Sequence, residues 1–450
     1  MPKWKKVICL LLCVLIFFAS SHCARKPKEK RKLVLIGIDA GSWNVINPLL
    51  EQGKLPNFKY LIDNGASGYL TTFKRTNWSP VLWTSIITGK LPEKHGIQGY
   101  VSPKGFPINS TMRKVKDLPE LLSQNGYSVG FVGFWGSWPA EKVRGVMVSD
   151  LFSLERYKES SRQANYTTTD YSYLLPVKQV TYPEDFVKEI YPLLLTPKQV
   201  PRETYARLIL FNDQEWERFD NLQMMERKDF ESLLKFALVS DINFYLITRY
   251  IQDNEKPEVL AVYLEGVDIV GHFFWRYMEP EYFSPVPKRD IERFKDAIRN
   301  YYQLVDEWLG ELILASPQGT AFLIISDHGM ARVPKEGGYR GMSLHSGTHT
   351  TRPHPDGIII FSGPGIKKGH KIEKAHILDI TPTVLYYLGL PVGKDMDGKV
   401  ILEAFEPDFV KKCPVRKIKT YDKKPRKVKE TSSPLDEEIL NKLRSIGYIQ

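Results

Sequence analysis

Acidic residues follow three of the apolar runs in this chain of 450 residues. Asp39 follows LVLIGI, Asp268 follows VLAVYLEGV, and Asp327 follows TAFLIIS with His328 beside it. A short apolar run bounded by a turn is typical of a buried parallel strand, which seldom ends in side chains that resist burial. Each acid alone is more often a turn or capping residue than a ligand, so the chemistry depends on what accompanies them.

Imidazole side chains accompany these acids. His272 lies four residues after Asp268, a spacing that puts both on one face of a helical turn. His349 and His354 follow in the segment SGTHTTRPHPDG. Together, carboxylates and imidazoles have the composition of a two-metal site with nitrogen and oxygen ligands, suited to Zn²⁺. The residue types alone leave a charged rim as an equally good interpretation.

A helical segment, SPVLWTSIITG (79–89), begins with a residue that could act on a substrate. We expect Ser79 at the N-cap, Pro80 at the first helical position and Gly89 at the end. A helix N-terminus offers N–H groups and a favourable dipole to an anion. The plain interpretation is a capping serine, and that role is compatible with a reactive hydroxyl.

The elements that would position these residues alternate along residues 33–405. Strand-like runs occur at 32–43, 127–139, 257–268, 320–327 and 356–365, and helical patterns at 56–65, 79–89, 290–314 and 377–390. This alternation predicts an α/β fold, with a largely parallel central sheet sandwiched by helices. Residues 155–257 lack clean strand runs and predict a mostly helical insertion. In such sheets, ligands gather at the carboxyl ends of the strands.

The positive charge of the chain is concentrated at its two ends. The net charge is +11, but residues 1–32 carry +8 and residues 411–430 carry another +8, which leaves residues 33–410 at −4. We expect solvated basic tails, with attraction to an anionic membrane surface as the alternative. The body has no basic patch interleaved with aromatic residues, which argues against nucleic acid as a specific partner.

Residues 1–24 have the features of an export signal or membrane anchor. A basic stretch, MPKWKK, precedes the apolar run VICLLLCVLIFFA. Cys23 resembles the lipidated cysteine of bacterial lipoproteins, although His22 stands where a small residue is expected. We expect an exported protein of the cell envelope or periplasm, with lipidation, an uncleaved anchor and ordinary secretion as alternatives. None of the four cysteines lies between residues 33 and 410, so the body has no internal disulfide and no thiol nucleophile.

Five separated segments resemble the alkaline phosphatase superfamily, and within it the type I phosphodiesterase/nucleotide pyrophosphatase branch. They are GIDAGSW, SPVLWTSIITGKLPEKHGI, EGVDIVGH, SDHGM and DGIIIFSGPGI. WPAEKVRGVMVSD, LDITPTVLYYLGLPVGKDMDGKV and the closing LRSIGYI are similar to uncharacterised bacterial members. The resemblance implies an alkaline-phosphatase-like catalytic domain over residues 33–405, and we expect a basic C-terminal tail over residues 406–450.

The resemblance also implies a role for each motif residue. One group matches the ligands of a first metal ion: Asp39, Ser79, Asp327 and His328. A second group matches the ligands of another: Asp268, His272 and His349, with His354 as the alternative to His349. Ser79 takes the place of the family's Ser or Thr nucleophile. The implied cofactors are two divalent metal ions, with Zn²⁺ preferred over Mn²⁺ or Mg²⁺.

The chemistry that follows is hydrolysis of a phosphate ester through a phosphoseryl intermediate. Coordination of a serine hydroxyl to a divalent metal stabilises the alkoxide, and a second metal can neutralise another phosphoryl oxygen. The expected function is therefore a metal-dependent phosphodiesterase or nucleotide pyrophosphatase that acts on a small molecule. The alternatives are a phosphomonoesterase or phosphomutase, a sulfatase, and a non-catalytic surface protein that uses the fold to bind a glycan or lipid headgroup.

Two departures from the family pattern leave the substrate open. Nucleotide pyrophosphatases place an Asn three residues after the nucleophile to hold a phosphoryl oxygen, and here that position is Leu82. No residue matches the Arg that phosphomonoesterases use. Lys74, Arg75 and Asn77 are near Ser79 in the sequence, so the group that holds the transferring oxygens is unassigned at this point.

Overall fold

The computed structural model of the chain describes residues 30–74, 76–152, 177–225, 229–283, 285–334, 345–350, 355–424 and 426–449. From Lys32 onward the chain forms one compact unit. The expected export signal lies outside the described residues, as does most of the first part of the expected insertion. Within the described ranges, no helix is both long enough and apolar enough to cross a membrane.

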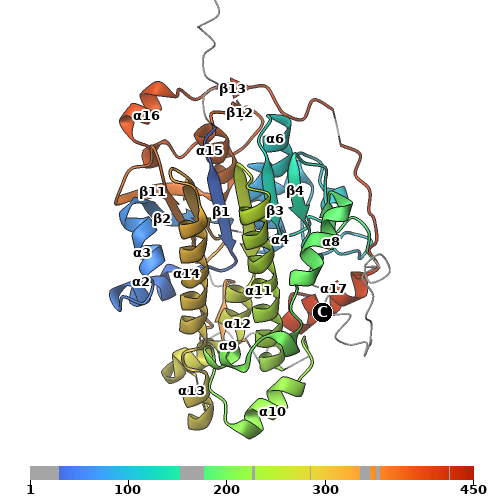
Figure 1. Cartoon of the computed structure of the whole chain (residues 1–450), viewed down its shortest axis with the longest axis vertical. Coiled ribbons are helices and arrows are strands. Elements are labelled where there is room, and N and C mark those ends of the chain that lie inside the picture. Colours follow the sequence, from blue (N-terminus) through green and yellow to red (C-terminus); the bar gives the residue numbers. More distant parts are fainter. Residues whose placement is uncertain are drawn as a thin grey trace, which may run out of the picture. The chain divides into compact units, whose positions relative to one another are not determined.

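A mixed sheet of nine strands runs through the described part of this unit, in the order β11-β2-β10-β7-β1-β6-β3-β4-β5 (Figure 1). The parallel strands at its centre are β7 (Ala321–Ile325), β1 (Leu33–Ile38), β6 (Val259–Leu264), β3 (Val129–Val132) and β4 (Gly145–Val148). The antiparallel strand β10 (Gly357–Ser362) joins β7 to β2 (Gly65–Thr71), and β11 (His370–His376) and β5 (Thr181–Tyr182) form the edges. The expected α/β class with a largely parallel sheet is confirmed.

Side chains of the central strands alternate between two apolar layers. In β1, Val34, Ile36 and Ile38 pack into one layer, whereas Leu33 and Leu35 pack into the other. All five are buried. Because both faces of a parallel sheet are covered, its strands are apolar at successive positions rather than at every second one.

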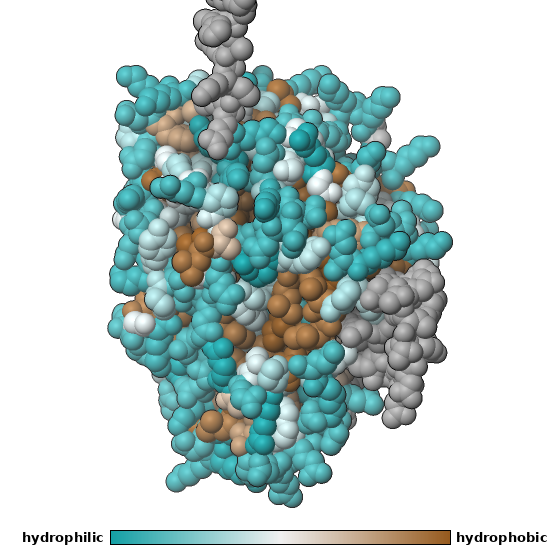
Figure 2. Space-filling view, viewed as in Figure 1, coloured by the Kyte–Doolittle hydropathy of each residue, from teal (hydrophilic) through white to brown (hydrophobic). Residues whose placement is uncertain are grey.

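Helices cover both faces of the sheet. The layer that contains Ile36 lies under α2 (Trp43–Glu51), α3 (Pro56–Asp63), α11 (Phe230–Asn254), α12 (Gly266–Met278), α14 (Ala297–Ala315) and α17 (Asp436–Ile446). The other layer lies under α4 (Ser79–Thr88), α6 (Leu118–Gln124) and α15 (Ile380–Tyr387). In Figure 1, α11 and α14 lie side by side in front of the sheet. Figure 2 shows a mostly hydrophilic surface over this face, with an apolar area near its middle.

Shorter elements connect these layers. The short helices are α5 (Pro92–His95), α8 (Val187–Ile190), α9 (Arg202–Ala206), α10 (Asp213–Asn221), α13 (Lys288–Phe294) and α16 (Pro407–Lys412). The short strands pair as β8 (Ala331–Arg332) with β9 (Gly347–Thr348) and as β12 (Val392–Gly393) with β13 (Lys417–Ile418). Between β5 and β6 the described chain is helical apart from its connections, so the mostly helical insertion is confirmed.

The single long helix expected over residues 290–314 is wrong, because α13 and α14 are separate helices there. The carbonyl of Arg293 accepts a hydrogen bond from the backbone N–H of Leu210, at 3.1 Å. An uninterrupted helix would use that carbonyl for the N–H of Ala297. A tertiary hydrogen bond from the insertion therefore replaces a helical one, and the helix is interrupted between α13 and α14.

The segment after residue 405 is more than a solvated tail. Leu435, Leu443 and Ile446, in and beside α17, are buried in the same layer as α11 and α12. The basic stretch before them keeps most of its Lys and Arg side chains exposed. The apolar spacing of α17 thus attaches the end of the chain to the compact unit, while the charge remains on the surface.

Candidate metal centre

Asp39, Asp327 and His328 form the first group, at the carboxyl ends of β1 and β7. These strands are parallel neighbours, so the residues that follow them meet at one edge of the sheet. The ligand atoms of the three side chains lie within 4.8 Å of one another. His328 Nε2 lies 3.4 Å from Asp39 Oδ1 and 3.4 Å from Asp327 Oδ2. The strand-end acids that the sequence picks out therefore converge.

Asp268, His272 and His349 form the second group. His272 Nε2 lies 3.4 Å from Asp268 Oδ1, and His349 Nε2 lies 4.0 Å from the same oxygen. The interpretation of Asp268 as the end of a strand is wrong, because β6 ends at Leu264 and Asp268 lies in the first turn of α12. The expected helical spacing between Asp268 and His272 does hold, since both lie on that helix.

The two groups are adjacent. The imidazole rings of His328 and His349 stack with their centroids 4.0 Å apart and their planes 17° from parallel. All six side chains are buried. His349 is thus the histidine that joins the second group among the described residues, whereas its alternative, His354, lies outside them.

Hydrogen bonds hold one oxygen of two carboxylates and leave the other oxygen facing the group. Asp39 Oδ2 accepts from the Tyr263 hydroxyl and from Trp83 Nε1, the latter at 3.3 Å. Asp268 Oδ2 accepts from the Tyr448 hydroxyl. The Oδ1 atoms of both acids are also buried, but they have no hydrogen-bond partner among the described residues. Buried acceptors left in this way are expensive unless a cation satisfies them.

The imidazoles are oriented in a similar way. His272 Nδ1 lies 3.0 Å from the carbonyl oxygen of Gly347, and His328 Nδ1 lies 3.1 Å from that of Gly329. A ring that donates through Nδ1 keeps its lone pair at Nε2, where a metal ion can bind. Both Nε2 atoms face carboxylate oxygens of their own group. The donor set and its supporting contacts therefore fit divalent metal ions.

The charges of the two groups point to the same conclusion. Burial and, after it, the charge of Asp268 raise the pKa of Asp39 to about 7. Burial and the charges of Asp39 and Asp268 raise the pKa of Asp327 well above its ordinary value. Burial opposes ionisation of Asp268 too, but the neighbouring histidines, His272 first, lower its pKa. A bound cation would supply a positive charge beside Asp39 and Asp327 and would thereby favour their ionised forms.

A third acidic group differs from these two. Asp117, Glu120 and Glu141 also lie close together. Arg113 lies 2.7 Å from Asp117, and Arg426 lies 2.9 Å from Glu120. Because arginines already neutralise these carboxylates, we interpret the group as an ion-pair network.

Ser79 is the first residue of α4, and the N-cap is Trp78, so the expected capping position is wrong. The Ser79 side chain is fully buried, and its hydroxyl makes no regular hydrogen bond with the described residues. The hydroxyls of Ser79 and Tyr100 are close enough for a weak interaction, although they do not meet regular hydrogen-bond geometry. Trp83, one turn along α4, donates to Asp39 and thereby ties this helix to the first group.

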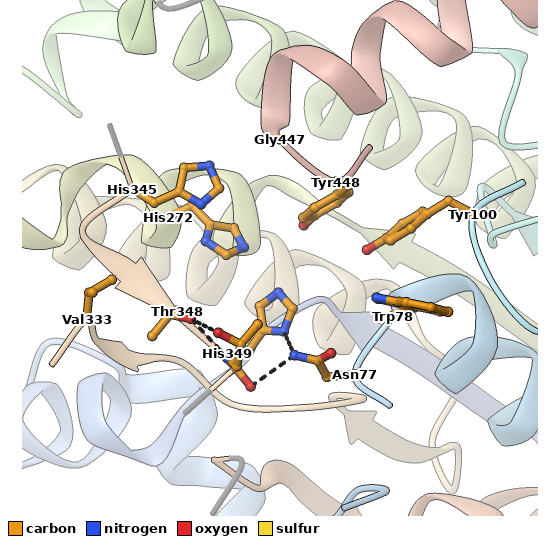
Figure 3. A pocket seen from close by; sticks show the side chains of 11 residues that line it. Asn77, Trp78, Tyr100, His272, Val333, His345, Thr348, His349, Gly447 and Tyr448 are labelled. Carbon is orange, nitrogen blue, oxygen red and sulfur yellow. Dashed lines mark hydrogen bonds between the residues drawn. The ribbon is translucent and has the colours of Figure 1, made fainter. Parts of the chain in front are cut away.

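A cavity of about 170 Å³ opens beside the second group (Figure 3). Its ring-bearing lining residues are Trp78, Tyr100, His272, His345, His349 and Tyr448. The Tyr100 and Tyr448 rings stack with their centroids 4.8 Å apart and their planes 19° from parallel. Asn77 also lines the cavity, and its side-chain nitrogen lies 3.0 Å from His349 Nδ1.

The motifs and spacings of the sequence do not indicate several residues of this region. Tyr100, Tyr263 and Tyr448 belong to no spacing pattern, although Tyr448 lies in the closing LRSIGYI. Of the residues near Ser79 in the sequence, Asn77 reaches the cavity and Lys74 is exposed, whereas Arg75 lies outside the described residues. Leu82 is buried in the apolar layer beneath α4 and offers no polar group.

Comparison with protein families gives a match over most of the chain. The family model described as type I phosphodiesterase/nucleotide pyrophosphatase matches residues 33–377. The 2,3-bisphosphoglycerate-independent phosphoglycerate mutase of Agrobacterium fabrum is 33% identical over 105 residues, which are 22% of this chain and 19% of that enzyme. Human arylsulfatase K is 28% identical over 152 residues, 31% of this chain and 27% of that protein. The chain therefore spans only about a fifth to a quarter of the length of these relatives.

Solved structures give distant likenesses. Murine ectonucleotide pyrophosphatase/phosphodiesterase 5 in complex with AMP is 13% identical with a TM-score of 0.43, over 80% of this chain and 96% of that chain. The phosphonate monoester hydrolase of Silicibacter pomeroyi is 14% identical with a TM-score of 0.45, over 84% of this chain and 78% of that chain. Neither is similar enough to indicate a substrate.

In the metal-free protein, Asp39→Asn should stabilise the fold at pH 8 and change it less at pH 5. The raised pKa of Asp39 means that the folded state holds a proton there more tightly than the unfolded chain. Stability from this group is therefore present below its ordinary pKa of 3.8 and is lost as the pH rises to about 7. The gain at pH 8 should reach at most about 4 kcal/mol.

Urea unfolding of the metal-free proteins at both pH values measures this difference. Asp408→Asn, at an exposed position on α16, is the matched control and should leave stability unchanged. With saturating Zn²⁺ the order should reverse, because the variant lacks one of the carboxylates that could bind the ion. An Asp39→Asn protein that is no more stable than the parent at pH 8 without metal would contradict the burial argument.

Proposed function

The chain belongs to the type I phosphodiesterase/nucleotide pyrophosphatase family, and from that premise we propose that it hydrolyses phosphate esters of small molecules. The observation that carries this proposal is the pair of adjacent buried groups, which turn carboxylate oxygens and imidazole nitrogens toward one place. Phosphodiesters and pyrophosphates are the preferred substrates, since they are the ones in the family's description.

Two divalent ions complete the proposed site. Asp39, Ser79, Asp327 and His328 would hold one ion, and Asp268, His272 and His349 would hold the other. Nitrogen and oxygen donors suit Zn²⁺ best, with Mn²⁺ or Mg²⁺ as alternatives. When bound, such ions lower the pKa of a coordinated hydroxyl and neutralise charge on phosphoryl oxygens.

Ser79 is the proposed nucleophile. Its oxygen loses its proton to solvent and forms a bond to phosphorus while the bond to the leaving oxygen breaks, which releases an alcohol or phosphate and produces a phosphoseryl enzyme. Water then attacks the same phosphorus, the bond between phosphorus and the serine oxygen breaks, and a proton from the water restores the serine hydroxyl. The position of Ser79 at the start of α4 supports this role, because the first N–H groups of the helix favour an anion there.

Tyr100 is the proposed donor to a transferring phosphoryl oxygen, a function that Leu82 cannot perform. Its hydroxyl is buried beside that of Ser79 and makes no regular hydrogen bond with the described residues. Burial, and after it the charge of Asp268, raise the pKa of Tyr100 well above its ordinary value. The hydroxyl therefore keeps its proton and is available to donate to a developing negative charge.

A phosphomutase or phosphomonoesterase is the second candidate. The observation that favours it is the local similarity to phosphoglycerate mutases, which covers 22% of this chain. A substrate panel should therefore contain monoesters and a sulfate ester in addition to diesters and pyrophosphates. Preferential turnover of monoesters would favour this candidate over the phosphodiesterase.

We also propose that the protein is exported and lies in the cell envelope or periplasm. The basic stretch and apolar run of residues 1–24 support this, with Cys23 as a candidate lipid attachment site. The exposed basic side chains of residues 411–430 suit an anionic membrane surface.

Ser79→Ala should lower kcat by three or more orders of magnitude and leave the fold intact, because the substitution removes the attacking oxygen but no helix cap. Ser79→Thr should keep measurable activity. Thr84→Ala is the matched control, since the Thr84 hydroxyl donates to the carbonyl of Pro80 on the same helix. Steady-state turnover of a phosphodiester by the metal-loaded proteins checks this. Parent-like turnover by Ser79→Ala would rule out the phosphoseryl route.

Tyr100→Phe should lower kcat by about 100-fold, the effect typical of losing one donor to a developing oxyanion. Metal content and KM should change little, because the ring and its stacking partner remain. Tyr127→Phe is the control: it removes another buried tyrosine hydroxyl, one that donates to the carbonyl of Leu388 at 2.6 Å. Equal kcat values for Tyr100→Phe and the parent would show that the Tyr100 hydroxyl is not the donor to the phosphoryl oxygen.

A reporter that is active only outside the cytoplasm, fused after residue 60, should be active when residues 1–24 are present. Deletion of the apolar run should abolish that activity, because this run is the proposed export feature. Reporter activity that persists after this deletion, or a reporter confined to the cytoplasm, would contradict export by this segment.

A further inference from the structure

The end of the chain reaches the second metal group across a large distance in the sequence. Gly447 caps α17 with a left-handed backbone, at a φ of 90°, and this turns Tyr448 away from the helix axis. The Tyr448 hydroxyl donates to Asp268 Oδ2, 180 residues earlier in the chain. Figure 3 shows Tyr448 beside Tyr100, with its hydroxyl on the side of His272.

A second contact involves the other ligand on α12. The carbonyl oxygen of Ile446, at the end of α17, lies 2.7 Å from His345 Nε2 and accepts a hydrogen bond from it. The His345 ring packs on the ring of His272, with centroids 4.7 Å apart. The Tyr448 ring also meets the His272 ring edge-on, at 5.9 Å. The end of α17 and Tyr448, two residues beyond it, therefore support both Asp268 and His272.

A third contact holds the start of α12. Lys442 Nζ lies 2.9 and 2.6 Å from the two carboxylate oxygens of Glu265, the residue that precedes this helix. Both side chains are nearly buried, and the Lys442 ammonium lies 5.1 Å from the ring centres of Trp135 and Phe236. Removing one partner of such a pair is costly, so this contact anchors α17 to the first turn of α12.

The segment that leads to α17 is also attached to the body. Arg426 pairs with Glu120 at 2.9 Å, and Asn109 donates to the carbonyl of Thr431 at 2.7 Å. The buried side chains of α17 pack in the apolar layer that also contains side chains of α11 and α12. These contacts attach α17 to the body next to Gly447 and Tyr448, which line the cavity.

We propose that Tyr448 is a positioning residue for the second metal group, and that α17 is thereby a component of the site. The Tyr448 hydroxyl donates a hydrogen bond to Asp268 Oδ2, so that the other carboxylate oxygen, Oδ1, faces His272 and His349. Without this hydrogen bond, the Asp268 carboxylate would be free to rotate about its Cβ–Cγ bond. This inference rests on the proposed metal-dependent function. Loss of a supporting contact of this kind typically weakens metal binding by 10- to 100-fold.

Tyr448→Phe in the full-length protein tests the inference, because it removes the hydroxyl and keeps the ring that stacks on Tyr100. Zn²⁺ titration against a competing chelator should show two ions in the parent. In the variant, one ion should bind about 10- to 100-fold more weakly, whereas the other should stay within about twofold of the parent value.

Tyr421→Phe is the matched control. Tyr421 lies in the same C-terminal segment, and its hydroxyl donates to the carbonyl of Pro391 at 2.6 Å, away from both metal groups. This variant should bind both ions like the parent. Similar urea midpoints for the two metal-free variants would show that a difference in Zn²⁺ binding does not come from unfolding.

Hydrogen exchange gives a readout that is independent of activity and of metal titration. If α17 and the second group stabilise one another, Zn²⁺ should slow amide exchange in residues 436–446 of the parent, and less so in Tyr448→Phe. A variant that binds both ions as tightly as the parent, with the same exchange protection, would overturn this inference alone. A parent that binds no ion would instead overturn the proposed function, and this inference with it.

Discussion

Three carboxylates buried at one edge of the sheet are the constraint on which the rest of the structure depends. Asp39, Asp268 and Asp327 are each at most 2% exposed. The histidines around Asp268 offset its burial, but Asp39 and Asp327 have pKa values raised by burial and by the neighbouring acids. A site of this kind is stable as a set of full charges only with a cation bound. We therefore regard the metal-binding chemistry and the packing of this edge as one problem.

The surrounding structure meets this constraint by taking one oxygen of a carboxylate into a hydrogen bond. Tyr263 on β6 and Trp83 on α4 hold Asp39, whereas Tyr448 beyond α17 holds Asp268. The same contacts tie together elements that are far apart in the sequence. Because α4 begins with Ser79, the hydrogen bond from Trp83 to Asp39 also helps to hold the proposed nucleophile near the first group. Orientation of the ligands and assembly of the fold thus use the same side chains.

The proposed reaction depends on what lines the cavity as much as on the ligands. The family position for an oxygen-holding Asn is Leu82, which packs in the apolar layer. Tyr100 and Asn77, which are among the polar residues that line the cavity, come from other positions. In the proposed reaction, Tyr100 would donate to the transferring oxygen in place of that Asn, from a different part of the site. This is why family membership supports the reaction class more firmly than the substrate.

Much of the fold and most of the candidate ligands could be predicted from the sequence, because these features are local. The central strands are apolar over successive residues, and Asp268 and His272 are related by one helical turn. Expectations failed where a distant contact intervened, as when Leu210 takes the carbonyl of Arg293 and separates α13 from α14. The tertiary structure alone decided that Tyr100 and Tyr448 meet beside Asp268, since no periodicity relates residues so far apart. By itself, then, the sequence determined which residues could do chemistry, through strand ends and helical spacing. Packing decided how their atoms are aimed, because hydrogen-bond geometry depends on elements brought together only in the folded chain.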